Sequence, residues 1–486
     1  MTVQDATTHP APRPLRPAPC VANFIANEFV PPRSGNYIDD VSPSTEEVIA
    51  AIPDSDERDV DDAVQTAARA FPAWSRTSAA ERSRLLLKVA DCIEKHFDEL
   101  AELEARDSGK PLTLARTLDI PRAIANFRFF ATAILHQSSD AHVTDTTALN
   151  YTLRQPLGVV GLISPWNLPL YLLSWKIAPA IAAGNACVAK PSEMTPLTAH
   201  RLAELVVDAG VPPGVINIVH GLGGKAGRAL TCHDSVAAIS FTGGTVTGAA
   251  VAANAAPRFK KLSLELGGKN PTIVFGDADL DQALPTAIRA SFWNQGEICL
   301  CGSRIFVEKS IYERFVDGFV ERAKALRIGE DLGALISEAH LRKVLGYIDL
   351  AKKEGGTIAT GGNRIDRRGY FVEPTVITGL GCDCRVLQEE IFGPVVTITP
   401  FDGEEEAVAF ANSTKYGLSA SLWTRDLQRA HRVAAAVDSG TVWINCWLLR
   451  DLRVPFGGMR ESGVGREGGF ASLEFFTEAK NVCVKL

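Results

Sequence analysis

The feature that most constrains the fold is an alternation of short apolar runs with helical patterns, which begins near residue 157 and continues to about residue 445. Short continuous apolar runs mark strands buried on both faces, and such strands joined by helices form parallel sheets covered by helices. A first group of runs lies at Val159–Ile163, Ala186–Ala189, Val215–Val219, Ala237–Phe241 and Leu262–Leu266, and a second at Thr272–Phe275, Arg304–Val307, Val395–Pro400 and Gly440–Asn445. Helical patterns within the first group lie at Leu172–Ala183, Pro196–Ala209 and Ala226–Cys232. We therefore predict an α/β protein with two consecutive sheet-centred units.

Two helices are predicted before this region. Apolar residues between Val60 and Phe71 fall on one helical face. Ser78 and Glu81 have the spacing of a capping box, and the helix that they open is expected to run to Gly109. Residues 1–20 are rich in Pro, Thr and Ala, so we expect a disordered tail there.

Composition excludes several classes of protein. The formal net charge is −7, so no bulk positive field attracts nucleic acid or an anionic membrane. The longest apolar region, about 168–189, is interrupted by Lys176 and Asn185, and no membrane span is predicted. Ten cysteines are too few for a disulfide-rich secreted scaffold, and no signal peptide precedes them, so we expect a cytoplasmic, thiol-reduced protein. The Cys-x-Cys pairs at Cys299/Cys301 and Cys382/Cys384 lack the usual spacing of a structural zinc site, so no metal is predicted.

Residues suited to a nucleotide follow the predicted strands. Because parallel sheets bind ligands at the carboxyl ends of their strands, these residues should converge. The segment from Gly221 to Ala226 fits the pattern G-x-G-x-x-G/A of a dinucleotide fingerprint, although the acidic residue expected further on is missing. Glu193, close to Lys190, could accept bonds from both hydroxyls of the adenosine ribose and would repel a 2′-phosphate. This pair favours NAD over NADP.

Two further residues have surroundings unlike those of a simple core. Cys299 follows Gln295-Gly296-Glu297-Ile298, whereas structural cysteines usually lie within uniform apolar runs. Glu265 precedes Gly267-Gly268, where the backbone can approach a ligand closely. Each residue alone fits an ordinary structural role as well as a catalytic one.

Together these segments resemble the aldehyde dehydrogenase superfamily, from about Ala22 to Leu486. The motifs that carry the resemblance are Pro165-Trp166-Asn167, Lys190-Pro191-Ser192-Glu193, Phe241-Thr242-Gly243, Leu264–Lys269, Gln295–Cys299, Glu389–Pro394, Pro455–Gly458 and Ser462–Glu467. The resemblance implies a Rossmann-like NAD domain (21–138 and 157–263), an α/β catalytic domain (264–455) and a small oligomerisation arm (139–156 and 468–486). It also implies a homodimer or homotetramer.

The resemblance implies NAD-dependent oxidation of an aldehyde to an acid. Cys299 would be the nucleophile, forming a thiohemiacetal and then a thioester, and its thiol should need a local positive field or a base. Asn167 and the backbone N–H of Cys299 would hold the oxyanion, and Glu265 would activate the hydrolytic water. Glu390 would bind the nicotinamide ribose, and Phe392 would pack near it. The other implied cofactor residues are Ile163, Ser164, Pro165, Trp166, Lys190, Ser192, Glu193, Gly223, Phe241, Thr242, Gly243, Gly244, Gly248, Leu266 and Gly267.

The chain departs from the family pattern in two places. Gly244 stands where serine is frequent, which removes one side-chain bond to phosphate, and the segment 326–336 lacks a loop of the family. Neither departure touches Cys299, Glu265 or Asn167.

Within the family, the chain resembles the 2-aminomuconic and 2-hydroxymuconic semialdehyde dehydrogenases. The segments concerned are Ala115–Arg122, Leu168–Leu170, Cys299–Cys301 and Trp447–Arg453. The resemblance implies a substrate whose far carboxylate is held by Arg116 and Arg450, since an arginine fork binds a carboxylate bidentately. The alternative is that both are surface charges paired with Asp119 and Asp451. Other aldehydes, such as retinal, betaine aldehyde or aliphatic semialdehydes, and an inactive structural relative, remain as further alternatives.

Overall fold

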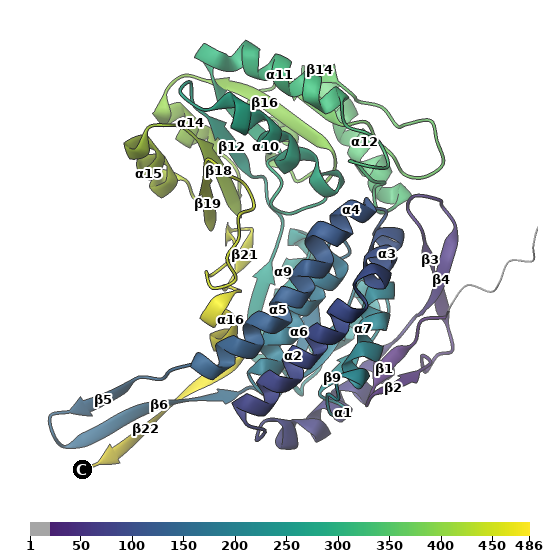
Figure 1. Cartoon of the computed structure of the whole chain (residues 1–486), viewed down its shortest axis with the longest axis vertical. Helices are drawn as coiled ribbons and strands as arrows, with labels where there is room; N and C mark the ends of the chain where they lie inside the picture. Colours follow the sequence, from purple (N-terminus) through teal and green to yellow (C-terminus); the bar gives the residue numbers. More distant parts are fainter. Residues whose placement is uncertain (1–19) are drawn as a thin grey trace, which may run out of the picture.

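The computed structural model describes residues 20–486, which form two sheet-centred units and an extended arm (Figure 1). The predicted disordered tail lies outside the described residues except for Cys20, which forms a β-bridge with Ala51. The predicted α/β class with two consecutive units is confirmed.

The first unit is built on an eight-stranded sheet with the order β2-β1-β9-β8-β7-β10-β11-β21. Its parallel strands are β7 (Val159–Ile163), β8 (Ala186–Lys190), β9 (Ile216–Ile218), β10 (Val236–Thr242) and β11 (Lys261–Glu265). These strands are the five predicted apolar runs. Three short antiparallel strands at the edges were not predicted, namely β1 (Asn23–Ile25), β2 (Glu28–Val30) and β21 (Gly463–Val464).

Alternate residues of each central strand pack against different helices. In β7, Val160 and Leu162 belong to the core on one face, whereas Val159 and Ile163 belong to the core on the other. Because side chains alternate along a strand and both faces are covered, the run is apolar throughout. The first face is covered by α2 (Ala79–Lys95), α3 (Phe97–Ser108), α5 (Ile120–Ala133), α6 (Pro169–Ala182) and α7 (Leu197–Asp208), and the second by α1 (Glu57–Trp74), α8 (Arg228–Cys232) and α9 (Thr245–Ala255).

The long helix predicted from Ser78 to Gly109 is instead two helices that meet at His96. The backbone of His96 is not helical (φ −108°, ψ 28°), and its Nδ1 bonds to the carbonyl of Cys92 at 2.9 Å, which ends α2. The Ser78 side chain accepts from the N–H of Glu81 at 3.2 Å, but the Glu81 carboxylate pairs with Arg84 rather than completing the capping box. The predicted start at Ser78 and end at Gly109 are confirmed, but the break at His96 was not predicted.

The second unit is built on a seven-stranded sheet with the order β14-β15-β16-β13-β12-β18-β19. Its strands are β12 (Pro271–Val274), β13 (Arg304–Glu308), β14 (Thr357–Thr360), β15 (Thr375–Thr378), β16 (Val395–Phe401), β18 (Ser419–Trp423) and β19 (Thr441–Ile444). Its helices are α10 (Leu280–Phe292), α11 (Tyr312–Lys324), α12 (Glu338–Lys353), α13 (Arg385–Gln388), α14 (Glu404–Ala411) and α15 (Leu427–Ala436). β11 is the last parallel strand of the first sheet, and β12, the next strand along the chain, belongs to the second sheet, so the chain passes from one sheet to the other between Glu265 and Pro271.

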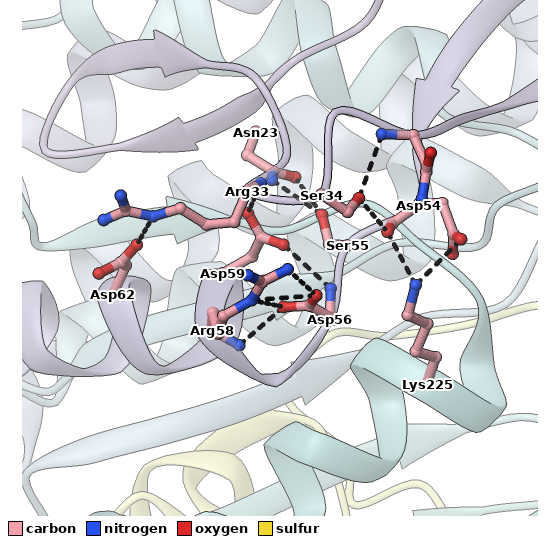
Figure 2. Close-up of polar contacts among 11 residues, drawn as sticks. Asn23, Arg33, Ser34, Asp54, Ser55, Asp56, Arg58, Asp59, Asp62 and Lys225 are labelled. Atoms are coloured by element: carbon pink, nitrogen blue, oxygen red, sulfur yellow. Dashed lines mark hydrogen bonds and ion pairs between the residues drawn. The ribbon is translucent and has the colours of Figure 1, made fainter.

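A polar network ties the N-terminal segment to the loop that carries the predicted fingerprint (Figure 2). This segment includes the hairpin of β3 (Tyr37–Val41) and β4 (Val48–Pro53). Asp56 caps α1 and forms a capping box with Asp59. Lys225 donates to the backbone carbonyl and the carboxylate of Asp54, at 3.1 and 3.0 Å. The N-terminal segment, which is not part of the parallel strands, therefore holds residues 221–227 in place.

The arm is a three-stranded sheet that extends away from both units at the lower left of Figure 1. It contains β5 (Ala141–Thr144), β6 (Ala148–Pro156) and β22 (Thr477–Lys485), and α16 (Gly469–Phe475) leads into β22. The short strands β17 (Tyr416–Gly417) and β20 (Met459–Arg460) pair near the last part of the second unit. Among residues 20–486, no helix has the length and apolarity needed to cross a membrane.

Candidate active site

Two cavities meet at Cys299. The first has a volume of about 130 Å³, and the second about 220 Å³. Both are lined by Leu172, Thr242 and Cys299. The first continues along Leu118, Arg122, Leu168, Tyr171, Trp175, Glu265, Arg289, Trp293, Ile298, Leu300, Leu448, Arg450, Phe456 and Glu467. The second continues along Pro165, Trp166, Asn167, Gly243, Gly244, Leu266, Gly267, His340, Lys343, Glu390 and Phe392. A reacting carbon bound at Cys299 is thus reachable from two sides.

The loop that carries Cys299 has a strained backbone. Asn294 and Gln295 have φ values of 50° and 55°, a left-handed conformation that non-glycine residues seldom adopt. Gly296 is also left-handed, and a Cβ there would lie 2.2 Å from the carbonyl oxygen of Gly393. Such strain persists only where the surroundings enforce it, and it is concentrated at functional sites.

Side-chain amides fix this loop. Asn294 Nδ2 donates to the carbonyl of Asn167 at 3.0 Å and to that of Glu297 at 3.2 Å. Asn270 Nδ2 donates to the carbonyls of Cys299 and Cys301 at 2.7 and 2.9 Å. The Cys299 side chain lines both cavities, whereas Cys301 is buried and lines neither. Cys299 is therefore the thiol that a ligand can reach.

Asn167 lies opposite this loop, directly before α6. Its Nδ2 donates to the carbonyl of Glu297 at 2.8 Å, and the side chain borders the second cavity. An amide nitrogen carries two hydrogens, so the second is available to an oxygen of a ligand. The predicted pairing of the Asn167 amide with a negatively charged oxygen is geometrically open.

Glu265 stands at the end of β11, beside Thr242 of β10 in the parallel register. Its side chain lines the first cavity, and its Oε1 has no hydrogen-bond partner within residues 20–486. Burial raises the pKa of Glu265 well above its ordinary value, and the nearby Glu467 carboxylate adds to this rise, while Lys176 and Arg450 oppose it. A buried carboxyl with a raised pKa is the kind of group that exchanges protons near neutral pH.

The electrostatics around Cys299 differ from the predicted positive field. Burial raises the pKa of the Cys299 thiol, and the carboxylates of Glu265 and Glu390 raise it further. Arg450 is the cation that acts in the opposite direction, and its effect is smaller. Of the two possibilities predicted, a positive field or a base, the base fits this site better, because burial and two acids outweigh the one arginine. A thiolate here must form by transfer of its proton to a base.

The second cavity has the features of a nicotinamide site. Glu390 Oε1 accepts from the N–H of Gly268 at 2.9 Å, and a Cβ on Gly267 would lie 2.3 Å from Glu390 Oε2. Phe392 and Trp166 form an edge-to-face pair with ring centroids 5.4 Å apart. His340 and Lys343 also line this cavity, and neither was predicted. They lie on α12, and no motif quoted from the sequence includes that helix.

The remaining predicted cofactor residues lie along the carboxyl ends of the first sheet. Ile163 pairs in register with Lys190 on one side and Phe241 on the other. Gly244 is the N-cap of α9, and a Cβ on Gly248 would lie 2.3 Å from Leu266 Cδ2, so this helix packs closely on the strand end. The buried hydroxyls of Ser164 and Thr242 have no partner within the described chain. A helix N-terminus with unpaired donors beside it suits a phosphate.

At the far end of this edge, Glu193 pairs with Lys190, with Oε2 and Nζ 2.8 Å apart. Burial acts to raise the pKa of Glu193, but Lys190 outweighs it, and the net pKa is below the ordinary value. Glu193 is therefore a carboxylate at neutral pH, as a contact to ribose hydroxyls requires. The backbone of Gly223 contacts the Glu193 carboxylate, and a notional Cβ there would meet no atom within 4 Å. Ser192 precedes Glu193 in the chain, and its hydroxyl accepts from the N–H of Met194. These residues fit a bound dinucleotide.

Comparison with known proteins agrees with this geometry. The aldehyde dehydrogenase family profile matches residues 29–482. This chain belongs to the aldehyde dehydrogenase family. It is 53% identical to the 2-aminomuconic semialdehyde dehydrogenase of Danio rerio, covering 95% of this chain and 98% of that protein. It is 48% identical to the 2-hydroxymuconic semialdehyde dehydrogenase of Pseudomonas sp. strain CF600, covering 96% and 99%. The NAD⁺ complex of the Bacillus cereus aldehyde dehydrogenase superposes with a TM-score of 0.95, at 42% identity and 96% coverage of both chains. The protein is an NAD-dependent enzyme that oxidises an aldehyde.

This aldehyde dehydrogenase has a buried polar triad that sequence reasoning missed. Lys176 Nζ lies 3.0 Å from Glu467 Oε1 and 2.8 Å from Ser240 Oγ, and Ser240 Oγ donates to Glu467 Oε1 at 2.9 Å. Glu467 borders the same cavity as Glu265. The one visible signal was Lys176 itself, a charge inside an otherwise apolar helix.

The structure brings Arg450, but not Arg116, to the first cavity of the aldehyde dehydrogenase. Arg116 pairs with Asp98 at 3.0 Å, and 44% of its side chain is exposed. It lies in a π-helix, Ala115–Asp119, whose buried residues Ala115, Leu118 and Asp119 take the inner face. Arg122, six residues further on, lines the cavity instead. Tertiary packing therefore turns the Arg116 side chain toward solvent, and its assignment to the substrate stays an untested prediction.

Proposed function

We propose that the substrate of this aldehyde dehydrogenase is 2-aminomuconic 6-semialdehyde, which is oxidised to 2-aminomuconate. The observation that carries this proposal is a cavity with a nucleophile at one end and arginines on its wall. Arg450 and Arg122 line the same cavity as Cys299. A conjugated chain with an aldehyde at one end and a carboxylate at the other matches this distribution of groups.

Aromatic rings hold Arg450 and Arg122, two of the three arginines that line this cavity. The Arg450 guanidinium lies 3.9 Å from the ring centroid of Phe456 and 5.5 Å from that of Trp175, and Nη1 donates to the Tyr171 hydroxyl at 3.3 Å. Arg122 lies 5.6 Å from the ring centroid of Tyr171. A guanidinium has five N–H donors, so these contacts leave donors for a bidentate carboxylate. Stacking on rings orients the fork before a substrate binds.

For the chemical steps, we propose that Cys299 transfers its proton to a base and that its sulfur bonds to the aldehyde carbon. The resulting oxyanion is held by the Asn167 amide and the Cys299 backbone N–H. When bound, NAD supplies the acceptor for the hydride that leaves this carbon. Glu265 then takes a proton from water, and the hydroxyl attacks the thioester carbon and releases Cys299. Glu390, Phe392, Trp166 and the residues at the sheet edge orient the dinucleotide.

The test is a comparison of three aldehydes. We expect kcat/KM to be highest for 2-aminomuconic semialdehyde, lower for 2-hydroxymuconic semialdehyde, and lowest for a neutral aldehyde of similar length, with NADH absorbance as the signal. A preference for the hydroxy compound would move the substrate to the alternative that the Pseudomonas relative represents. Equal rates with the neutral aldehyde would contradict any carboxylate-bearing substrate.

We also propose that the arm joins protomers into a homodimer or homotetramer. Its strands β5, β6 and β22 extend from the units, and Val143, Leu153 and Val484 on them are exposed. Exposed apolar residues on a sheet with open edges favour pairing with a second copy. A monomeric mass in sedimentation would contradict this.

A cytoplasmic location is supported by ten cysteines that are all free thiols.

A further inference from the structure

A buried lysine holds the residue whose amide faces the reacting oxygen. Lys110 lies in the turn between α3 and α4 (Leu112–Leu114). Its Nζ donates to the backbone carbonyl of Asn167 at 3.0 Å and to Asp119 Oδ2 at 3.0 Å. The side chains of Lys110 and Asp119 are both 0% exposed. Water therefore cannot replace either contact.

The turn that carries Lys110 is itself fixed by both units. Gly109 ends α3 in a left-handed conformation, and a Cβ there would lie 2.8 Å from Pro43 Cβ. Its carbonyl accepts from the N–H of Ala334 in the second unit at 3.0 Å. The backbone next to Lys110 is therefore held by contacts with both units.

A side chain of α3 holds the other end of the Asn167 turn. The Glu104 carboxylate accepts from the N–H of Leu170, in the first turn of α6, at 3.1 Å, and from the Thr198 hydroxyl at 2.7 Å. A carboxylate at a helix N-terminus is favourable because it satisfies a free N–H and the helix dipole. Lys110 on the carbonyl of Asn167 and Glu104 on the N–H of Leu170 therefore fix both ends of one short turn.

We propose that Lys110 is a positioning residue for aldehyde oxidation, which places the Asn167 amide by holding the Asn167 backbone carbonyl. The inference rests on the oxyanion role proposed above for Asn167. Asn294 Nδ2 bonds to the same carbonyl at 3.0 Å, so the nucleophile loop and the Asn167 turn share one anchor. A displacement of about 1 Å at a reacting centre can cost about 100-fold in rate, so an anchor of this kind affects catalysis without touching substrate.

The charge of Lys110 is balanced within the protein. Asp119 is its ion-pair partner, and the buried carboxyl groups of Glu104 and Glu297 also lie close enough for Lys110 to lower their pKa values, although burial raises both overall. Removing Lys110 alone would leave Asp119 buried without a partner, which destabilises proteins strongly. The test must therefore neutralise both members of the pair.

The test variant is Lys110→Met with Asp119→Asn. We expect hydride transfer, measured as NADH absorbance in a single turnover with saturating NAD and aldehyde, to slow by about 10- to 100-fold. The affinity for NAD and the KM for aldehyde should change little, because neither residue lines the two cavities. If melting shows that this variant does not fold, Lys110→Gln with Asp119→Asn replaces it, since it keeps polar side chains of similar size.

A double-mutant cycle separates positioning from general stability. Asn167→Ala should slow hydride transfer by about 100- to 1,000-fold. In the Asn167→Ala background, the Lys110 and Asp119 changes should cause no further loss, because the amide that they place is gone. The same fold loss in both backgrounds would overturn the inference, as would an unchanged rate in the Lys110→Met/Asp119→Asn variant while Asn167→Ala is slow.

Two controls complete the experiment. Asn217 is buried and donates from Nδ2 to the carbonyls of Cys187 and Gly214 at 3.2 and 2.8 Å, but it lines neither cavity. Asn217→Ala should lower the melting temperature and leave hydride transfer unchanged. A normal rate in Asn167→Ala alone would contradict the oxyanion role itself, and the inference about Lys110 with it.

Discussion

Replacement of Arg450 tests the carboxylate-binding proposal most directly. Arg450→Met keeps an unbranched side chain that can still pack on Phe456 and Trp175, but it removes the guanidinium that faces the cavity of Cys299. We expect kcat/KM to fall for a muconic semialdehyde and to change much less for an uncharged aldehyde of similar length. The ratio of the two decreases in kcat/KM measures how much the Arg450 guanidinium contributes to binding the substrate carboxylate.

The magnitude follows from the burial of the guanidinium. A hydrogen-bonded contact to a charged group contributes about 1.5–3 kcal/mol when it is desolvated. Arg450 is only half-buried, so water retains part of its solvation and the lower end of that range applies. A loss of about 1.5–2 kcal/mol corresponds to about a 10- to 30-fold decrease in kcat/KM.

Arg450 also affects both substrates through Glu265. Its positive charge lowers the pKa of that carboxyl, so its removal raises the pKa and reduces the fraction of base at neutral pH. This effect acts after the substrate has formed its thioester and is shared by charged and neutral aldehydes. The ratio of the two kcat/KM values cancels it, together with any loss of folded enzyme.

The matched control is Arg116→Met. Arg116 is the other arginine that the resemblance assigns to the substrate carboxylate, but it pairs with Asp98 at the surface, and exposed pairs contribute about 0–1 kcal/mol to stability. Its kcat/KM should stay near that of the unmodified enzyme for both substrates. If Arg450→Met slows the charged and the neutral aldehyde by the same factor, or if Arg116→Met causes the selective loss, the reasoning from the cavity is refuted.

Three further predictions concern the reaction itself. Cys299→Ala should abolish turnover whereas Cys301→Ala should retain most of it, because only Cys299 lines the two cavities; an active Cys299→Ala enzyme in a steady-state assay would contradict this. Because the pKa of Glu265 is raised, its base form appears only as pH increases, so kcat should rise with pH through that pKa. In Glu265→Gln this rise of kcat with pH should disappear. The variant should give a burst of NADH followed by slow turnover, and its covalent adduct should be visible in the intact mass. Glu193→Gln should narrow the preference for NAD over NADP in kcat/KM, since it removes a carboxylate that repels a 2′-phosphate; a wider preference would exclude that repulsion.

The central sheet could be predicted because its strands are buried on both faces. Val159–Ile163 is apolar at every position, since neighbouring residues pack into different cores. By contrast, β18 was missed because Ser419 and Ser421 interrupt its apolar residues, and these serines are buried beside other strands. The serines break the continuous apolar run by which the other central strands were recognised, although all five residues of β18 are buried.

The active site likewise contains residues that the sequence could identify and contacts that it could not. Cys299, Glu265 and Asn167 each lie in a local motif, and the structure gathers them as the motifs imply. Lys176 and Glu467 are 291 residues apart in sequence, and their contact depends on how the C-terminal segment crosses the first sheet. Similarly, the raised pKa of the Cys299 thiol arises from burial and from carboxylates of distant segments. No spacing along the chain encodes either property.

The choice between Arg116 and Arg122 shows why even a correct motif does not identify its functional side chain. Each residue of an α-helix advances by about 100°, so positions six apart point about 120° away from each other, and only one of the two arginines can face a given cavity. The π-helix at Ala115–Asp119 adds a residue to one turn and changes the register again. The two arginines have different neighbours. The Arg122 guanidinium lies over the ring of Tyr171 on α6, whereas Arg116 forms an ion pair with Asp98 of α3. The side chain that lines the cavity is therefore determined by the neighbouring helix and not by the segment in which it occurs.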